Sequence, residues 1–289
     1  NNSVDGKPIL YLEGATGEVI SNVDAGQVIL VSCGNIAVEN INTYVGIELL
    51  KTSKSRVVNN HISAMPWMRW ASQNGYICLT EITGIYLESS SDNEITGNEI
   101  KNDTSQTPGN TGTWQIGEGI GISLQEGYGP PWKHSSSNLI SNNAISDTKQ
   151  GITLSESSND NILRDNSLTR TGLFIYDSYH NTVSNNSVDG KPILYLEGAT
   201  GEVISNVDAG QVILVSCGNI AVENINTYVG IELLKTSKSR VVNNHISAMP
   251  WMRWASQNGY ICLTEITGIY LESSSDNVIS GNELVCTFE

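Results

Sequence analysis

The sequence predicts an all-β fold, in which about eleven short coils stack into a solenoid of the parallel β-helix kind. A Gly-Ile-x-Leu motif recurs along the chain, at its closest about every 20 residues. Its apolar residues alternate with polar ones, which is typical of a strand with one buried face. Gly, Asn and Ser separate the copies and favour left-handed corners. Because so small a coil cannot bury its own apolar face, it must stack on the next one.

A second motif, Asn-x-Ile-x-x-Asn-x-Ile, follows the first after a corner rich in Ser and Asn. The clearest copy joins Gly84–Leu87 to Asn93–Ile100, and another joins Gly151–Leu154 to Asn161–Leu168. We expect inward Ile, Leu and Val side chains to stack on their counterparts in neighbouring coils, and aligned asparagines to form amide ladders. The asparagines expected in these ladders are Asn93, Asn98, Asn161 and Asn166.

The chain also contains a much longer repeat. Residues 1–93 recur letter for letter as residues 185–277, an offset of 184 residues. We therefore expect one continuous β-helix over residues 1–289, made of a full repeat unit (1–184) and a partial second unit (185–289).

Three coils are longer than the rest, and their extra residues must leave the solenoid as loops. The loops between Ile62 and Gly84 and between Ile100 and Gly121 leave from the same corner of neighbouring coils. The third loop, Gln125–Ser136, leaves from a different corner.

Charge and hydropathy exclude two classes of partner. Lys and Arg number 15 against 30 Asp and Glu, which gives a formal net charge of −15. A nucleic acid is bound largely through neutralisation of its phosphates, so this chain is not expected to bind one. No apolar run approaches the roughly 20 residues that span a bilayer, so no membrane span is expected.

The motifs above, together with Asp24–Val31 and Gly34–Ile41, resemble the NosD-type right-handed parallel β-helix repeats, within the wider group of carbohydrate-binding and sugar-hydrolase β-helices. The pattern is most similar to that of archaeal, particularly methanogen, cell-surface and sheath-type proteins. The resemblance covers nearly the whole chain and implies a right-handed coil. Members of the group include polysaccharide hydrolases, lyases and epimerases, transport accessory proteins and structural surface proteins. The resemblance therefore specifies the fold more closely than the activity.

Candidate catalytic residues are sparse. The polygalacturonase-type motifs Asn-Thr-Asp, Asp-Asp, Gly-His-Gly and Arg-Ile-Lys are absent from the sequence. Glycosidases need two carboxylates that flank the scissile bond, and the weak candidates are Glu48 and Glu88, which follow Gly-Ile runs. A solvated outer face explains both residues more simply, so the sequence favours a protein that is not an enzyme.

The least solenoid-like stretch is Met65–Trp70, which recurs as Met249–Trp254. Trp and Arg are frequent in binding hot spots, and aromatic faces stack on sugar rings. Trp114 lies in the loop that leaves the same corner of the next coil, which places it near the first stretch. The alternative is that these rings only pack on the outer sheet. The candidate binding or assembly residues are Trp67, Arg69, Trp70, Trp114, Trp251, Arg253 and Trp254.

The positions of the cysteines predict buried free thiols and one candidate for a disulfide bond. Cys33 and Cys217 end strand-like runs and are expected to be buried and unpaired. They are copies of each other, about seven coils apart, which is too far for a disulfide. Cys286 is a candidate for an intermolecular disulfide, with an intrachain bond to Cys262 as the alternative.

No metal or cofactor is expected. His61, Met65 and Met68 offer imidazole and thioether ligands to copper, but their spacing fits no compact site. Met in an apolar loop is usually a packing residue. The glycine-rich nonapeptide repeat that binds calcium is absent.

We expect an extracellular structural protein whose β-helices assemble into a cell-surface layer, sheath, hoop or filament. Residues 1–4 are identical to the mid-coil residues 185–188, so no N-terminal cap is expected and the open coil end can continue into another subunit. Sequons at Asn102 and Asn185 are candidate glycosylation sites in that location. The alternative is a polysaccharide-binding or polysaccharide-processing β-helix, and a weaker alternative is a copper-accessory protein. The expected partners are other copies of the chain and cell-surface polysaccharide.

Overall fold

The structure is a computed structural model of the 289-residue chain. It describes residues 2–64, 68–71, 76–79, 83–102, 119–127, 133–248 and 268–286. Every regular element in these ranges is a β-strand, as the sequence predicts. The described residues include no helix long and apolar enough to cross a membrane.

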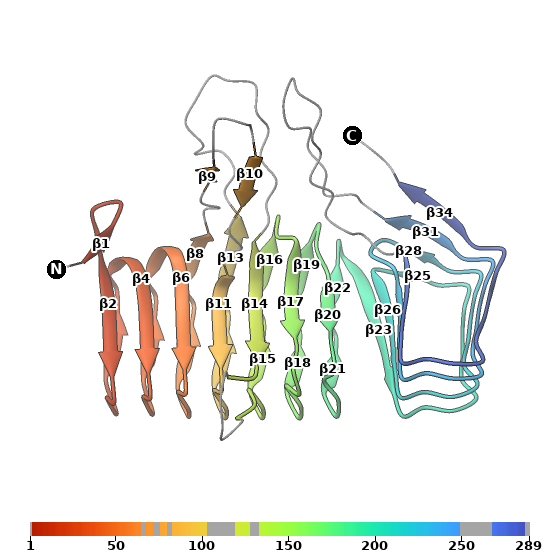
Figure 1. The fold of residues 1–289 in the computed structure, drawn as a ribbon, viewed down its shortest axis with the longest axis horizontal. Coiled ribbons are helices and arrows are strands. Elements are labelled where there is room, and N and C mark those ends of the chain that lie inside the picture. Colours follow the sequence, from red (N-terminus) through yellow and green to blue (C-terminus); the bar gives the residue numbers. More distant parts are fainter. Residues whose placement is uncertain are drawn as a thin grey trace.

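The strands form two stacks of coils, and the coils of each stack contribute to three parallel sheets, which we name faces A, B and C (Figure 1). In the first stack, face A comprises β2 (Lys7–Glu13), β4 (Asp24–Val31), β6 (Asn42–Leu50), β11 (Thr83–Glu88), β14 (Ile120–Gln125), β17 (Gln150–Leu154) and β20 (Leu173–Ile175). Face B comprises β3 (Val19–Ser21), β5 (Ala37–Glu39), β7 (Arg56–Val58), β12 (Glu94–Thr96), β15 (Leu139–Ser141), β18 (Ile162–Arg164) and β21 (Thr182–Ser184). Face C comprises the starts of β4 and β6, then β8 (His61–Ala64), β13 (Glu99–Asn102), β16 (Ala144–Ser146), β19 (Ser167–Thr169) and β22 (Ser187–Val188).

The second stack repeats this arrangement with fewer coils. Its face A comprises β23 (Lys191–Glu197), β26 (Gln211–Val215), β29 (Ile231–Leu234) and β32 (Ile269–Glu272). Its face B comprises β24 (Val203–Ser205), β27 (Ala221–Glu223), β30 (Arg240–Val242) and β33 (Val278–Ser280). Its face C comprises β25 (Asp208–Ala209), β28 (Asn226–Thr227), β31 (His245–Ala248) and β34 (Glu283–Cys286). The seven face A strands of the first stack and the four of the second match the predicted number of coils.

The loops leave the solenoid at the predicted corners. The first two follow β8 and β13, which are neighbours on face C, where Glu99 pairs with His61. The third follows β14 on face A. Two antiparallel strands, β9 (Met68–Ala71) and β10 (Tyr76–Leu79), lie in the first insertion. At the start of the chain, β1 (Ser3–Val4) forms a hairpin with β2.

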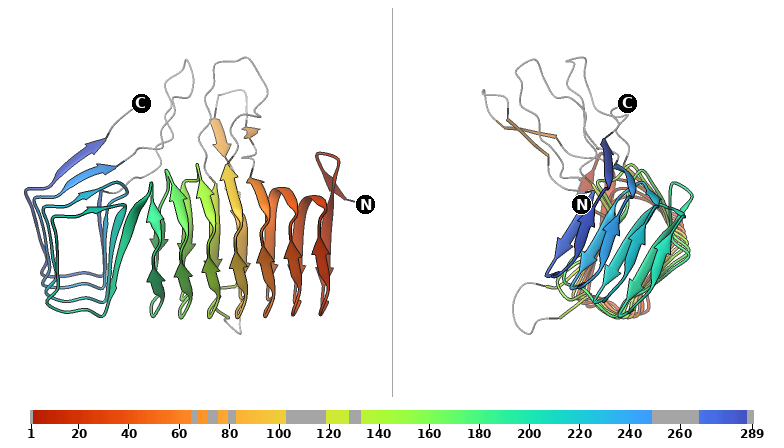
Figure 2. Two further views of the ribbon diagram at one scale, coloured as in Figure 1. Left: turned by 180° about the vertical axis from the view of Figure 1, so that it is seen from behind. Right: turned by 90° about the vertical axis from the view of Figure 1, so that its right-hand side faces the viewer.

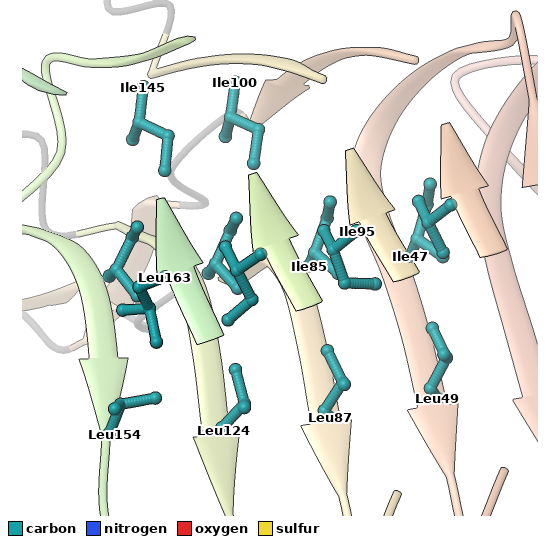
Figure 3. Close-up of a cluster of buried hydrophobic side chains, with 14 of the residues drawn as sticks. Ile47, Leu49, Ile85, Leu87, Ile95, Ile100, Leu124, Ile145, Leu154 and Leu163 are labelled. Atoms are coloured by element: carbon teal, nitrogen blue, oxygen red, sulfur yellow. The ribbon is translucent and has the colours of Figure 1, made fainter. Parts of the chain in front are cut away.

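Like side chains stack on like side chains in the core (Figure 3). On face A, Ile85 pairs in register with Ile47 of the preceding coil and Ile122 of the next. All three are fully buried, and burial of one such side chain contributes about 1.5–3 kcal/mol. Two residues further along, a second fully buried column comprises Leu49, Leu87, Leu124 and Leu154.

The glycine of each Gly-Ile run lies where consecutive coils approach most closely. A Cβ atom on Gly84 would lie 2.8 Å from the carbonyl oxygen of Gly121, and one on Gly121 would lie 2.4 Å from the carbonyl oxygen of Gly151. Cβ atoms do not approach a backbone oxygen so closely. The glycine in the motif is therefore required by contact between coils.

The corners between faces B and C share one construction. A residue in a left-handed conformation, such as Asn59 (φ 54°) or Asn142 (φ 55°), precedes a buried Asn. Asn98 Oδ1 accepts hydrogen bonds from the backbone N of Asn60 (3.0 Å) and from its Nδ2 (2.9 Å). Asn98 Nδ2 in turn donates to Asn143 Oδ1 (3.0 Å). The ladder positions predicted from the sequence, Asn93, Asn98, Asn161 and Asn166, are all buried and hydrogen-bonded between coils.

The two stacks do not form one uninterrupted column. β22 and β23 are antiparallel and are joined by a tight turn at Asp189 (φ 48°) and Gly190 (φ 74°). On face B, β21 and β24 belong to separate sheets. The second stack lies across the end of the first (Figures 1 and 2). This arrangement differs from the expected continuous β-helix over residues 1–289, because the chain reverses direction at the turn.

We predict that an asparagine inside an amide ladder contributes more to the free energy of unfolding than an asparagine at the end of the ladder. Asn282 is the copy of Asn98; it accepts from Asn244 (2.9 Å) and donates to the Val241 carbonyl (2.8 Å), and its coil is the last one described. Asn98→Ala should lower the free energy of unfolding by about 2–3 kcal/mol, and Asn282→Ala by about 1 kcal/mol, because Asn98 leaves more buried partners unpaired. Urea unfolding of both variants measures the difference. Equal losses would contradict the larger contribution of the interior position.

Candidate functional site

The outward side of face A in the first stack carries the candidate carboxylates. Because side chains alternate along a strand, the inward Ile85 and Leu87 leave Tyr86 and Glu88 on the outside. Over four consecutive coils, the polar and aromatic side chains on this side form what we call the outer row, which comprises Gln27, Glu48, Tyr86, Glu88 and Gln125.

Along the stack, the outer row contains two hydrogen-bonded groups, Gln27 with Glu48 and Tyr86 with Glu88 and Gln125. Gln27 Nε2 donates to Glu48 Oε1 (2.6 Å). Tyr86 lies directly beside Glu48 in the strand register, and its hydroxyl donates to Glu88 Oε2 (3.1 Å). Gln125 Nε2 donates to the Tyr86 hydroxyl. All five side chains are partly exposed, so the row offers amide, carboxyl and phenol groups to a ligand.

The two predicted carboxylates lie on adjacent strands and on the same side of the sheet, but out of register, because Glu88 pairs with Leu50 and Glu48 pairs with Tyr86. Burial raises the pKa of Glu48, the hydrogen bond from Gln27 lowers it by less, and the nearby Glu88 carboxylate raises it further. The pair therefore combines two partly exposed carboxyl groups, of which Glu48 has the raised pKa. Both accept hydrogen bonds, Glu48 from Gln27 and Glu88 from Tyr86.

The identical carboxyl group of the second stack lies in a different environment. Glu232, the copy of Glu48, is buried where the second stack meets the first, and it accepts a hydrogen bond from Gln211 Nε2 (2.9 Å). Burial raises the pKa of Glu232 to about 8, which the nearby Glu272 carboxylate reinforces. Burial also raises the pKa of Tyr176, on the first stack, to about 12, and the Glu232 charge adds to that shift.

This contact, which we call the joint, lies between the last coil of the first stack, β20 to β22, and the outward side of β23, β26 and β29. Sequence reasoning missed it, together with the role of Gln211 and Glu232 there. The available signal was the Asp189-Gly190 dipeptide between two strand-like runs, which is a strong indication of a hairpin.

The predicted aromatic surface lies mostly outside the described residues. Arg69 and Trp70 belong to β9, of which only the backbone is described. Trp67, Trp114, Trp251, Arg253 and Trp254 lie outside the described ranges. Their role in binding or assembly stays a prediction.

The structure describes some of the predicted cysteine and glycosylation sites. Cys33 and Cys217 are buried and free, as predicted. Cys286 ends β34 beside Ala248, while Cys262 lies outside the described residues, so the pairing of Cys286 stays a prediction. Asn185 is exposed in a left-handed corner (φ 55°), and Asn102 ends β13.

Within the described residues, no group of three or more His, Cys, Asp or Glu side chains is placed to hold a metal ion. His61 Nδ1 instead lies 3.2 Å from Glu99 Oε2, and its Nε2 lies 3.3 Å from the Ser63 hydroxyl. Met65, the second copper-ligand candidate, lies outside the described residues, as does the side chain of Met68.

The family model for the "Right handed beta helix region" matches residues 10–224. The chain belongs to the right-handed β-helix family. This match establishes the predicted fold and its hand; the narrower resemblance to NosD-type and archaeal repeats stays a prediction. No curated protein matches this β-helix in sequence.

Solved structures with a similar fold share little sequence with this β-helix. The A-module of a mannuronan C-5 epimerase from Azotobacter vinelandii is 14% identical, with a TM-score of 0.45 over 93% of this chain and 65% of that one. The catalytic domain of an α-1,3-glucanase in complex with nigerose is 12% identical, with a TM-score of 0.46 over 96% of this chain and 61% of that one. A tailspike protein of an E. coli bacteriophage in complex with a pentasaccharide is 10% identical, with a TM-score of 0.45 over 94% and 48%. The chain thus spans less than two thirds of each, and the likeness concerns the fold.

We predict that Glu232 makes the stability of this β-helix depend on pH. Its folded-state pKa of about 8 exceeds the ordinary value of 4.5, so the folded chain keeps a proton that the unfolded chain has lost. The free energy of unfolding therefore falls as the pH rises through that interval. Glu232→Gln, which keeps the shape without the charge, should raise stability by about 2–4 kcal/mol at pH 8 and change it little at pH 4.

Urea unfolding at pH 4, 6 and 8 measures this effect. Glu48→Gln is the matched control: it changes the same residue in the other copy, where the side chain is only partly buried and its pKa is raised less far, so a smaller pH effect is expected. Equal pH profiles for the parent chain and Glu232→Gln would show that burial at the joint does not hold the proton.

Proposed function

We propose that this β-helix is an extracellular saccharide-binding protein and that the outer row of the first stack is its recognition surface. The observation that supports this function is the succession of amide, carboxyl and phenol groups on the outward side of four consecutive coils, in two hydrogen-bonded groups. Sugar hydroxyl groups both donate and accept hydrogen bonds, so they need such mixed partners at short intervals. The Tyr86 ring adds an apolar surface for a sugar face.

The spacing of the row fits a polymer better than a single sugar. Parallel strands in a sheet lie about 4.8 Å apart, so a chain laid along the stack meets a new outward side chain at each coil. Glu48 and Tyr86 are in register on neighbouring strands, so the row runs along the stack. A repeating polysaccharide can therefore make the same type of contact with several coils at once.

The charge of the outer row indicates which class of polysaccharide it can bind. The outer row contains two carboxyl groups and no Lys or Arg, and the chain carries a net charge of −15. An acidic polysaccharide would be repelled by this field, so we assign a neutral polysaccharide as the ligand.

Tyr86→Ala and Gln125→Ala are each expected to weaken binding of a neutral polysaccharide by about tenfold, because the first removes a ring from the row and the second removes a hydrogen-bond donor. Affinity electrophoresis against a panel of neutral and acidic polysaccharides measures the loss. Tyr270→Ala is the matched control: it changes the same residue in the second stack, where Gln211 and Glu232, the copies of Gln27 and Glu48, are buried at the joint. Unchanged binding in Tyr86→Ala, or stronger binding of acidic polymers, would reject the assignment.

One observation favours a second function, that of a structural component of a cell-surface assembly. The outward side of face A packs onto a coil end at the joint, which shows that coil ends of this sequence are suited to contact with another stack. The predicted layer, sheath or filament requires such contacts between molecules. Sedimentation velocity across a wide concentration range should then show growing oligomers, whereas a chain that stays monomeric at high concentration contradicts the structural function.

A further inference from the structure

The second stack buries both sides of its face A. The inward side chains Val212 and Leu214 belong to the core of the second stack. The outward side chains are also buried, and they form one hydrophobic cluster with the last coil of the first stack, which contributes Leu173, Ile175 and Val188. The outward residues in this cluster are Ile193, Ile213, Val215 and Leu234, and their exposed fractions are 7%, 0%, 0% and 1%.

The joint also satisfies the free backbone groups of that last coil. Gln211 Oε1 accepts a hydrogen bond from the Leu173 backbone N (3.0 Å), and Gln211 Nε2 donates to the Leu173 carbonyl (2.7 Å). The Glu197 carboxylate accepts from the backbone N atoms of His180 (2.6 Å) and Asn181 (3.1 Å). These side chains replace the next coil that the solenoid would otherwise need, so the face A surface is a cap for a coil end.

The first stack carries the same surface, residue for residue. Residues 1–93 are identical to 185–277, so the apolar positions of the cap recur, and they are only partly buried in the first copy. We call them the free patch, which comprises Ile9, Ile29, Val31 and Leu50. The polar capping residues recur as well: Gln27 bonds to Glu48 (2.6 Å), and Glu13 accepts only from the Tyr11 hydroxyl among its described contacts (2.7 Å).

The hairpin that positions the cap is also present in both copies. β1 and β2 pair through Val4 and Lys7, as β22 and β23 pair through Val188 and Lys191. Asp5 (φ 48°) adopts the same left-handed conformation as Asp189 in the equivalent turn. The first copy is therefore already folded in the conformation that docks at the joint.

We propose that the free patch is the docking surface for the coil end of a second copy of the repeat unit placed in the chain ahead of residue 1, a coil end formed by residues 173–184 of that unit and completed by Asn1–Val4, the copy of 185–188. Tandem units then fold as short stacks that meet at corners, one corner per 184 residues, and not as a straight rod. The polar groups would bond as they do at the joint, with Gln27 on the backbone of Leu173 and Glu13 on those of His180 and Asn181 in the added unit.

This docking surface overlaps the outer row only at Gln27 and Glu48, the copies of Gln211 and Glu232. The joint buries Gln211 and Glu232 but leaves Tyr270 and Glu272 partly exposed. Docking at the free patch would likewise cover the Gln27 end of the outer row and leave its Tyr86 end open. Loss of saccharide binding and loss of docking can therefore be observed independently.

Thiol labelling tests the proposal. Ile29→Cys and Ile213→Cys are compared in the chain as it is, and the alkylated peptide is identified by mass spectrometry. The thiol at position 213 should react at least about tenfold more slowly than the thiol at 29, because it is exposed only when the joint opens. Ile29→Cys is then placed in the same chain with one further copy of residues 1–184 fused ahead of Asn1. Its reactivity should fall to that of Ile213→Cys.

The controls are Val19→Cys and Val203→Cys, whose parent side chains are 59% and 58% exposed in the two copies. Their reactivity should stay high in both chains, which separates docking from general burial or aggregation. An Ile29→Cys thiol that stays as reactive in the extended chain overturns the proposal. So does a loss of reactivity at the Val19→Cys control. Small-angle X-ray scattering of the unsubstituted extended chain gives a second test, since corners shorten its maximum dimension relative to one straight stack, and a straight rod contradicts the proposal.

Discussion

The structure depends on a simple constraint: each coil needs a neighbour on both sides. A coil leaves the N–H and C=O groups of its strands unpaired along one edge and exposes its apolar interior there. Inside a stack, the next coil satisfies both needs, which is why Ile85 lies between Ile47 and Ile122 in strict register. At the end of the first stack, the side chains of Gln211 and Glu197 supply the missing backbone partners.

The same constraint explains why the fold was predictable from the sequence. A coil that must repeat the register of its neighbour requires glycine where backbones touch, an inward Ile or Leu column, and an Asn able to bond along the stack. These requirements recur at fixed intervals, so Gly84, Ile85 and Asn98 each belong to a pattern that is visible without a structure. The number of coils and the corners that carry the loops follow from the same periodicity.

The joint was not predicted because periodicity carries no information about where a stack ends. The first and second copies share 93 identical residues, and an argument from the motif gives both copies the same surroundings. What differs is the neighbour: the second copy follows a complete coil at residues 173–188, and its hairpin turns back onto that coil. The outer row was found only in part for a related reason. Glu48 and Glu88 were visible as carboxylates, whereas Gln27 and Gln125 became relevant only once the register placed them beside these residues.

The two copies also bear on whether the carboxylate pair is catalytic. An acid–base pair for glycoside hydrolysis requires both groups to reach the scissile bond. In the second copy, Glu232 is buried under the first stack and accepts a hydrogen bond from Gln211 within the joint, away from any polymer. The same residue thus lies on a partly exposed surface in one copy and in a buried contact in the other. Neither catalysis nor charge alone explains its presence in both places. In both places the carboxyl group accepts a hydrogen bond from a glutamine side chain, Gln27 in one copy and Gln211 in the other, and burial raises its pKa, which suits recognition and packing better than catalysis.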